Sequence, residues 1–431
     1  MERIADELKK LGVSEFEIFY EERREQPVSF EQNVLQNLES KTEAGVGVRV
    51  VKDGRIGFTV SSDMRDPKAI AESAVASAKL GPEAAFSFPE NKGFPAISYE
   101  GGDWPTTERL SLGKEVVGEL SSVVPGLMVG FTASVITLKC RIINSSGLDA
   151  SYEKPFYLLA AHASGMTETG YLSDGGFAYL TKVPDPQELI NRTKERMKRA
   201  LTLGRIGSGR KRVILAPQAM ILMVESLEMG LSGKSVVKGS SPLRDKLGER
   251  IMGDKVDIWD DPLHPYLAGS RPFDDEGIPS RPRPIVEAGV LRSYNLDLWS
   301  AAKLGQEPTG SSSRNSYKQL PRAEFTNLLM NGGTESLNDI IRSVDEGIIV
   351  YDTIGGGQSN MMAGDFSFNV GLGFVISRGE IIGRVKDAMV AGNFYADSHN
   401  IISVSKEREP YGPTLLPYVL FDGLSVSVKE Q

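Results

Sequence analysis

The amino-acid sequence predicts an α+β protein with antiparallel sheets, packed helices in its N-terminal half and a β-rich C-terminal domain. Three observations lead to this prediction. Helical and strand-like periodicities alternate before about residue 205. The pair Asp53-Gly54 lies between two apolar runs and is a strong hairpin signal. From about residue 250 onward, strand-like runs separated by glycine-rich turns predominate.

The first predicted unit covers residues 1–88. Residues 2–11 carry apolar side chains at the spacing of one helical face. Asp66 and Pro67 are typical of an N-cap and a first helical residue, and Gly81 is expected to end the helix that they begin. Strands are expected at residues 15–22, 28–38, 45–51 and 56–60.

The second predicted unit covers residues 107–204. It follows a connector at residues 86–106 that is rich in proline and glycine. A helix is expected at residues 110–123, and a second one begins at Asp185-Pro186, where Glu188 completes the pattern of a capping box. Strands are expected at residues 127–136, 139–144 and 154–163.

The third predicted unit covers residues 210–431. A short buried strand at residues 211–216 is followed by a helix that Pro217 opens and Gly230 and Gly233 close. Strands are expected at residues 289–294, 347–352, 366–376 and 380–385. Two polar, glycine-rich segments, residues 303–323 and 353–364, are long for loops, and loops of this length are often functional.

Composition restricts the classes of function. The chain has 431 residues, 57 acidic and 49 basic, with a formal net charge of −8, which argues against non-specific binding to nucleic acid or anionic membranes. The basic run at residues 205–212 is expected to be a solvated linker. No apolar stretch approaches the ~20 residues of a membrane helix, and no signal peptide is visible. The single cysteine, Cys140, suits a reducing compartment, so we expect a cytoplasmic protein.

No familiar catalytic motif stands out in the chain. The three histidines, His162, His264 and His399, lie far apart in the sequence, and no His-Glu-x-x-His pair occurs. Cys140 has no nearby histidine and is expected to be a buried structural thiol. The run Gly355-Gly356-Gly357 lacks the lysine and spacing of a nucleotide-binding loop, so it favours a turn beside a cleft.

Several segments together resemble the TldD/PmbA family, whose members were once described as modulators of DNA gyrase. The resemblance spans nearly the whole chain and rests on the order and spacing of the segments. They are residues 16–24 (FEIFYEERR), 43–49 (EAGVGVR), 53–58 (DGRIGF), 142–147 (IINSSG), 356–360 (GGQSN), 364–367 (GDFS), 379–381 (GEI) and 385–386 (VK).

The resemblance assigns this chain to one of two branches. TldD-type chains carry a His-Glu-x-x-x-His helix and a later cysteine that hold zinc, whereas PmbA chains, also called TldE, lack these ligands. At the corresponding positions this chain has Val224, Glu225 and Met229, and the cysteine region, residues 405–413, contains no cysteine. Valine offers no lone pair and a thioether rarely binds zinc, so the chain resembles the PmbA/TldE branch. Glu225 without a metal is then expected to be an exposed residue of an amphipathic helix.

The resemblance implies a catalytically silent subunit that pairs with a zinc-bearing TldD-type chain and encloses a peptidase chamber, with no metal or cofactor of its own. Peptides or unfolded segments would be the substrates, and exposed strand edges could hold them. Gly355, Gly356, Gly357 and Asn360 are the candidates for lining the chamber. In isolation the chain could form a homodimer.

Two other interpretations stay open. One is a regulatory protein that binds a topoisomerase, which the family's older description suggests and the acidic charge balance does not. The other is a homodimeric hydrolase that uses ligands scattered along the chain.

Overall fold

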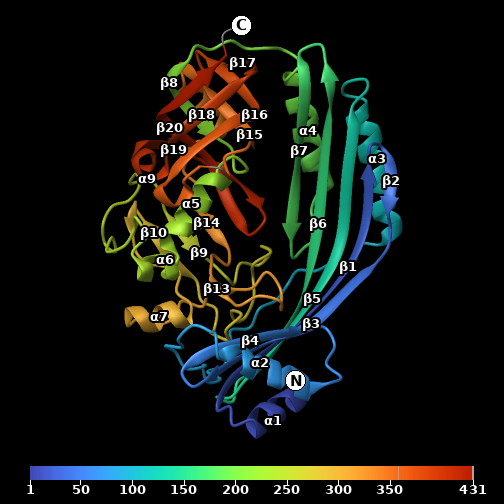
Figure 1. Cartoon of the computed structure of the whole chain (residues 1–431). Coiled ribbons are helices and arrows are strands. Elements are labelled where there is room, and N and C mark those ends of the chain that lie inside the picture. The colour runs from blue at the N-terminus through green and yellow to red at the C-terminus, as the bar shows by residue number, and fades with distance from the viewer. Residues whose placement is uncertain (358, 430–431) are drawn as a thin grey trace.

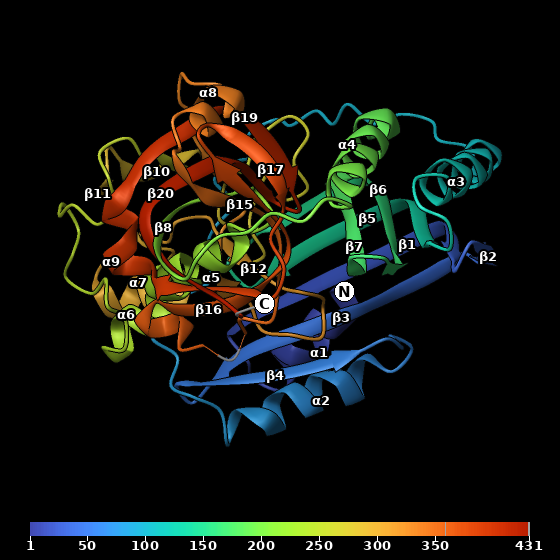
Figure 2. The same ribbon diagram turned by 90° about the horizontal axis from the view of Figure 1, so that it is seen from above.

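The structure is a computed structural model that describes residues 1–357 and 359–429. The molecule has two halves that lie side by side (Figure 1). The N-terminal half, coloured blue to green, is an open sheet of long strands with helices packed on it. The C-terminal half, coloured green to red, is a more strongly curved set of strands (Figure 2). The α+β class expected from the sequence is confirmed.

The N-terminal half contains long strands and helices of up to four turns. They are α1 (Glu2–Lys10), β1 (Glu15–Glu31), β2 (Val34–Asn37), β3 (Lys41–Lys52), β4 (Arg55–Ser61), α2 (Pro67–Ala78), α3 (Thr106–Ser121), β5 (Met128–Asn144), β6 (Asp149–Thr167), β7 (Gly170–Leu180) and α4 (Pro186–Arg199). β1 and β5 each join what the sequence predicted as two shorter strands, and β7 was not predicted. Pairing on both edges keeps β1 and β5 extended through residues whose side chains alone do not favour a strand.

All strand pairs of this half are antiparallel, in the order β4-β3-β1-β5-β6-β7, and β2 pairs with β1. β1 pairs with β3 from Glu15 to Glu25 and with β5 from Glu17 to Phe30. Residues 1–88 and 107–204, expected as two units, therefore share one sheet. The physical reason is the edge of β1, which would be left unpaired if the first unit stood alone.

The helices α2 and α4 begin where the sequence predicted, whereas α3 begins at Thr106, four residues before its predicted start. Asp66 accepts a hydrogen bond from Ala69 N (3.0 Å) at the start of α2, and Asp185 accepts one from Gln187 N (2.9 Å) at the start of α4. α1 and α2 cover one end of the sheet, and α3 and α4 cover the other. Among the described residues, no helix combines the length and apolar character needed to cross a membrane.

The C-terminal half begins with β8 and ends with β20. Its elements are β8 (Gly209–Leu215), α5 (Ile221–Leu231), α6 (Gly233–Lys238), β9 (Ile258–Asp260), β10 (Arg283–Glu287), β11 (Val290–Leu291), α7 (Leu298–Leu304), β12 (Ser312–Ser313), β13 (Arg322–Ala323), β14 (Leu328–Met330), α8 (Leu337–Arg342), β15 (Glu346–Ile354), the 3₁₀ turn η1 (Met361–Ala363), β16 (Asp365–Ser377), β17 (Glu380–Arg384), β18 (Ala388–Asn393), α9 (Phe394–Asp397), the 3₁₀ turn η2 (Ser398–Asn400), β19 (Ile401–Tyr411) and β20 (Thr414–Val428).

The strands of this half close a ring. β8 pairs with both β15 and β20, and the path β8-β15-β16-β18-β20 returns to β8. Most pairs are antiparallel as predicted, but β8–β15 and β14–β20 are parallel. These partners lie far apart in the sequence, so no hairpin turn fixes their relative direction.

The two halves meet along the sheet face that α1 to α4 leave uncovered. On that face, Phe19, Cys140 and Ile142 pack against Phe273 and Tyr317 of the C-terminal half. At the other end of the contact, α4 and the ring share an apolar core. The face of the sheet thus becomes one wall of the cavities described below.

Candidate functional site

α5 is the helix at which the sequence places the degenerate zinc positions. It buries Met223, Leu227 and Leu231 in the core of the ring, which is why this apolar segment folds as a helix there. Ser232 has an extended backbone and ends the helix, and α6 continues from it.

The three positions that correspond to the zinc motif point in different directions. Val224 is half-buried and packs against the core of the ring. Glu225 is exposed, as the sequence predicted. Met229 is 44% exposed and lines a cavity. Val224 thus faces the apolar core and Met229 faces the cavity, and neither side chain carries a donor that suits zinc.

The donor set at these positions does not fit zinc. A hydrocarbon, an exposed carboxylate and a thioether replace the imidazoles and thiolate that zinc prefers. Among the described residues, no three His, Cys, Asp or Glu side chains form a group suited to a metal ion. No chemical step is therefore derived through a metal on this chain.

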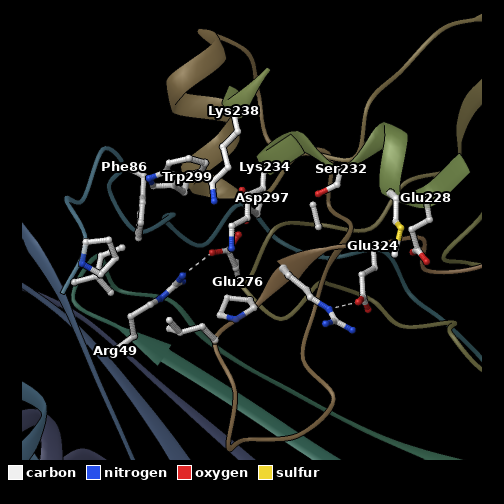
Figure 3. Close-up of a pocket in the computed structure, with 17 residues that line it drawn as sticks. Arg49, Phe86, Glu228, Ser232, Lys234, Lys238, Glu276, Asp297, Trp299 and Glu324 are labelled. Carbon is white, nitrogen blue, oxygen red and sulfur yellow. Dashed lines mark hydrogen bonds and ion pairs between the residues drawn. The ribbon is translucent and has the colours of Figure 1, made fainter. Parts of the chain in front are cut away.

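Beside α5 lies a partly open cavity of about 660 Å³ (Figure 3). It lies between the end of the N-terminal sheet and the helices α5, α6 and α7. The residues that line it come from both halves: Arg49, Ile56, Pro82, Phe86, Glu228, Met229, Ser232, Lys234, Lys238, Glu276, Asp297, Trp299, Leu320, Pro321, Arg322, Ala323 and Glu324. A cavity of this volume at the junction of two halves is a common place for a small-molecule or peptide side-chain site.

Glu228 is the residue of α5 that carries unusual chemistry, and the sequence analysis missed it. Its Oε1 accepts a hydrogen bond from Phe325 N (2.9 Å). Burial, aided by the charge of Glu324, raises the pKa of Glu228 to about 7, although the Phe325 N–H opposes this shift. The only signal in the sequence is an acidic residue four positions after Val224 in an apolar helix, and it does not separate Glu228 from Glu225.

Cationic side chains stand at the rim of this cavity. Lys234 and Lys238 are exposed on α6, and Figure 3 shows Lys238 descending beside Trp299. Asp297, which caps α7 through Ser300 N (2.8 Å), faces them, and burial followed by the charge of Glu276 raises the pKa of Asp297. The rim can therefore contact polar or acidic groups, while Phe86, Trp299 and Met229 supply apolar surface.

A buried ladder of ion pairs closes the inner end of the cavity. Arg49 of β3 contacts Glu17 of β1 and Glu276 of the C-terminal half, each at 2.7 Å, and Arg314 pairs with Glu17 from the other side. Glu276 also accepts hydrogen bonds from Leu298 N (2.8 Å) and Ser312 Oγ (2.7 Å).

The ladder ties the two halves together. Burial disfavours the charge of Arg49, but Glu17 and Glu276 outweigh it and raise the pKa of Arg49. The centres of the Phe86 and Phe88 rings each lie 5.1 Å from the guanidinium carbon of Arg49. These rings shield the ion pairs of Arg49 from water.

The proposed chamber residues lie at the other end of α5. Gly355 and Gly356 have φ of +82° and +97°, values that favour glycine, and a Cβ at Gly356 would approach Leu222 of α5 to 2.9 Å. Asn360 caps η1 by accepting from Ala363 N (3.3 Å). None of these residues, nor Gly357, belongs to the lining of the 660 Å³ cavity.

The remaining candidates stay apart from one another. His162 lies in the segment 154–163 predicted as a strand, where a core or half-exposed side chain is expected, but in the structure it is exposed on β6 opposite Gly130. His264 is half-buried in a turn, and His399 lies in η2. Cys140 is buried as predicted, and burial together with Asp275 raises the pKa of its thiol to about 12, which keeps it protonated.

Comparison with known families gives a consistent result. Residues 208–428 match the PmbA/TldA metallopeptidase C-terminal domain, and residues 16–78 match domain 1 of the same metallopeptidases. The chain belongs to the PmbA/TldD family. The match to the C-terminal domain includes α5, the ring of strands and the segment 320–324 that lines the cavity.

Relatives of this PmbA/TldD chain are moderately similar over most of their length. An uncharacterized protein of Methanocaldococcus jannaschii is 26% identical over 97% of this chain and 98% of its own. A protein of Methanothermobacter thermautotrophicus named a metalloprotease is 28% identical over 86% of this chain and 84% of its own.

Solved structures share the whole fold. TldE from Thermococcus kodakarensis superimposes with a TM-score of 0.88 at 25% identity, over 98% of this chain and all of that one. A Thermotoga maritima protein described as a candidate modulator of a DNA gyrase gives a TM-score of 0.89 at 26% identity, over 99% of this chain and all of that one.

Proposed function

We propose that this chain is the non-catalytic, TldE-like subunit of a zinc metallopeptidase that it forms with a TldD-type chain. The observation that carries the proposal is α5, where Val224 and Met229 stand at the positions of zinc-binding histidines and offer no donor that suits zinc. The similarity to a TldE structure over the full length supports the same role.

In this proposal the zinc and the activated water belong to the partner, and this chain holds no metal. Its own contribution is the wall of a shared chamber. The 660 Å³ cavity offers apolar surface from Trp299 and Phe86 beside the cations of Lys234 and Lys238, which suits a peptide with mixed side chains. Exposed strand edges could add peptide backbone by strand pairing. A reducing, cytoplasmic setting suits the single thiol of Cys140.

The test is reconstitution. Peptidase activity on an unfolded substrate is measured for this chain, for a TldD-type chain from the same source and for their mixture. We expect no cleavage by this chain alone and cleavage by the mixture that a chelator abolishes. Cleavage by this chain alone, lost on chelation, would contradict the proposal and favour a homodimeric hydrolase.

Pull-down from the native source distinguishes the remaining alternative. A TldD-type chain should co-purify if the proposal is correct, whereas a topoisomerase in its place would favour a regulatory role. Removing Gly355, Gly356 and Gly357 tests the chamber assignment, because we expect the mixture to lose activity. Full activity of that deletion variant in the mixture would remove these residues from the chamber.

A further inference from the structure

A second cavity, of about 310 Å³, lies on the helix-free face of the N-terminal sheet, where C-terminal loops cover it. It is separate from the cavity beside α5, although Glu324 lines both. Its lining comes from β1, β5, β6 and β7 and from three segments of the C-terminal half, residues 268–275, 313–315 and 324–326, with Pro413.

Lys154 of β6 is buried in this lining, with 4% of its surface exposed. Its Nζ donates to Ala268 O (3.0 Å) and Ser270 O (3.1 Å) and lies 4.6 Å from the centre of the Phe156 ring. Among the described residues, no carboxylate forms an ion pair with this ammonium within 4.0 Å, and the two carbonyl acceptors leave one of its three N–H donors for a further acceptor. A buried, uncompensated ammonium is costly unless an anion reaches it.

Two further buried groups in the same lining are unsatisfied. Arg271, 6% exposed, pairs through Nη1 with Asp275 (3.0 Å) and through Nη2 with Ser312 O (2.8 Å), but its Nε has no partner. Thr326, 4% exposed, has a hydroxyl with no partner. Buried polar atoms are normally hydrogen-bonded, so such a group around one cavity indicates a ligand or ordered water.

The chemistry of the cavity selects the ligand. Lys154, Arg271 and Thr326 supply donors, so the complementary group is an acceptor with negative charge. Asp275 and Glu21 line the same cavity and would repel a doubly charged phosphate, whereas a single carboxylate meets less repulsion. The aromatic rings of Tyr152, Phe156 and Tyr179 form apolar walls for the body that carries the carboxylate.

We propose that this cavity is a carboxylate-binding site, in which Lys154, Arg271 Nε and Thr326 Oγ1 hold the carboxylate of a ligand with an apolar or aromatic body. The ligand is either a small free acid or the carboxyl end of a peptide, since both present the same group. The site belongs to this chain alone, so it does not depend on the proposed assembly with a TldD-type subunit.

The test is calorimetric titration of the full chain with two matched pairs of probes. One pair is 3-phenylpropionate and 3-phenylpropionamide. The other is N-acetyl-Ala-Ala-Phe with a free carboxyl end and its C-terminal amide. We expect an acid that binds to do so at least about tenfold more tightly than the matching amide, because the amide lacks one charge-assisted contact. Binding of the small acid alone identifies a free metabolite as the source, and binding of the peptide acid identifies a chain end.

Variants locate the site. Lys154→Met should lower the affinity for the acid by about tenfold or more. Thr326→Val, which removes only a hydroxyl, should lower it by about threefold. Lys386→Met is the matched control. Lys386 lies outside this cavity, so this variant should bind the acid with the same affinity as the parent protein. Equal affinity for acid and amide, no binding of either acid at millimolar concentration, or unchanged binding by Lys154→Met would overturn the proposal. If Lys154→Met does not fold, the Thr326→Val variant and the acid–amide comparison still decide.

Discussion

The contact between the two halves of the protein holds buried charge in two different ways. In the ladder, Glu17, Arg49, Glu276 and Arg314 are all buried, and each faces an opposite charge. In the nearby cavity on the sheet face, Lys154 is equally buried, donates to two carbonyl oxygens beside an aromatic ring and forms no ion pair within 4.0 Å among the described residues.

The difference separates structure from binding. A buried charge with its partners in place fixes how two surfaces dock, and removing one partner leaves the other uncompensated. A buried charge without a partner costs stability in the empty protein and is available to a ligand. The same interface therefore has one region that holds the two halves together and one region that can bind a ligand.

The largest effect should come from breaking the ladder. Arg49→Met leaves Glu276 without its cation, and we expect the free energy of unfolding, measured by urea denaturation, to fall by about 3–5 kcal/mol. Arg65→Met is the control, because its pair with Asp63 is exposed and should matter little. A loss below about 1 kcal/mol in Arg49→Met would mean that the ladder does not hold the halves together.

The next effect concerns Lys154. Burial, then the charge of Arg271, lowers its pKa from 10.5 to about 7, while Cys140 and Asp275 oppose the shift. Between pH 7 and 10.5 the unfolded chain carries a proton on Lys154 that the folded protein lacks, so the free energy of unfolding rises with pH. We expect the parent protein to gain about 3 kcal/mol over Lys154→Met between pH 7 and about pH 9.5 in urea denaturation. A pH-independent difference would show that Lys154 has another charge partner; Lys386→Met serves as the control.

Glu228 should change stability with pH in the opposite direction to Lys154, and by a smaller amount. Burial raises its pKa from 4.5 to about 7, so the folded protein keeps a proton that the unfolded chain releases in this range, and stability falls as pH rises. Because the side chain is half-buried, we expect a loss of about 1–2 kcal/mol relative to Glu228→Gln between pH 4.5 and 7. Glu225→Gln, exposed on the same helix, is the matched control. Parallel pH profiles of the parent and Glu228→Gln would disprove this assignment.

The smallest effects distinguish the two degenerate positions of α5. Val224→His places an imidazole against the core of the ring and should cost about 1–2 kcal/mol, whereas Met229→His faces the cavity and should change stability by less than about 0.5 kcal/mol. Thermal or urea denaturation measures both. The later cysteine ligand is still missing, since residues 405–413 contain no cysteine, so the double variant should not retain zinc in competition with a chelator. Stoichiometric zinc in the double variant would show that imidazoles at positions 224 and 229 are enough to make a zinc site on this chain.

Features that depend on neighbours in the sequence were predictable. Asp53 and Gly54 take positive φ values of +52° and +72° and join β3 to β4, as their residue types indicate. Asp66 and Asp185 cap the helices that they were expected to begin, because a cap needs only backbone two or three residues away. The exposed Glu225 and the buried Cys140 followed from the same local periodicity.

Features that depend on distant partners were not predictable from one sequence. The merging of two expected units into one sheet depends on β1 and β5, and the parallel placement of β8 depends on β15. Arg49 and Glu276 are 227 residues apart, and neither carries a local pattern that marks it as buried. Glu228 could not be told from Glu225, since its raised pKa comes from burial in the tertiary structure and from the charge of Glu324.

The sequence by itself determined the caps of α2 and α4, the hairpin between β3 and β4 and the mixed fold class. It also determined the chemical character of α5, because the residue types at positions 224 and 229 decide whether zinc can be held. Only the tertiary structure decided where those side chains point, which charges are paired across the two halves, and that Lys154, Arg271 and Thr326 surround one cavity. The physical reason is that donor chemistry is a property of a single side chain, whereas burial and charge pairing arise only when distant segments are packed together.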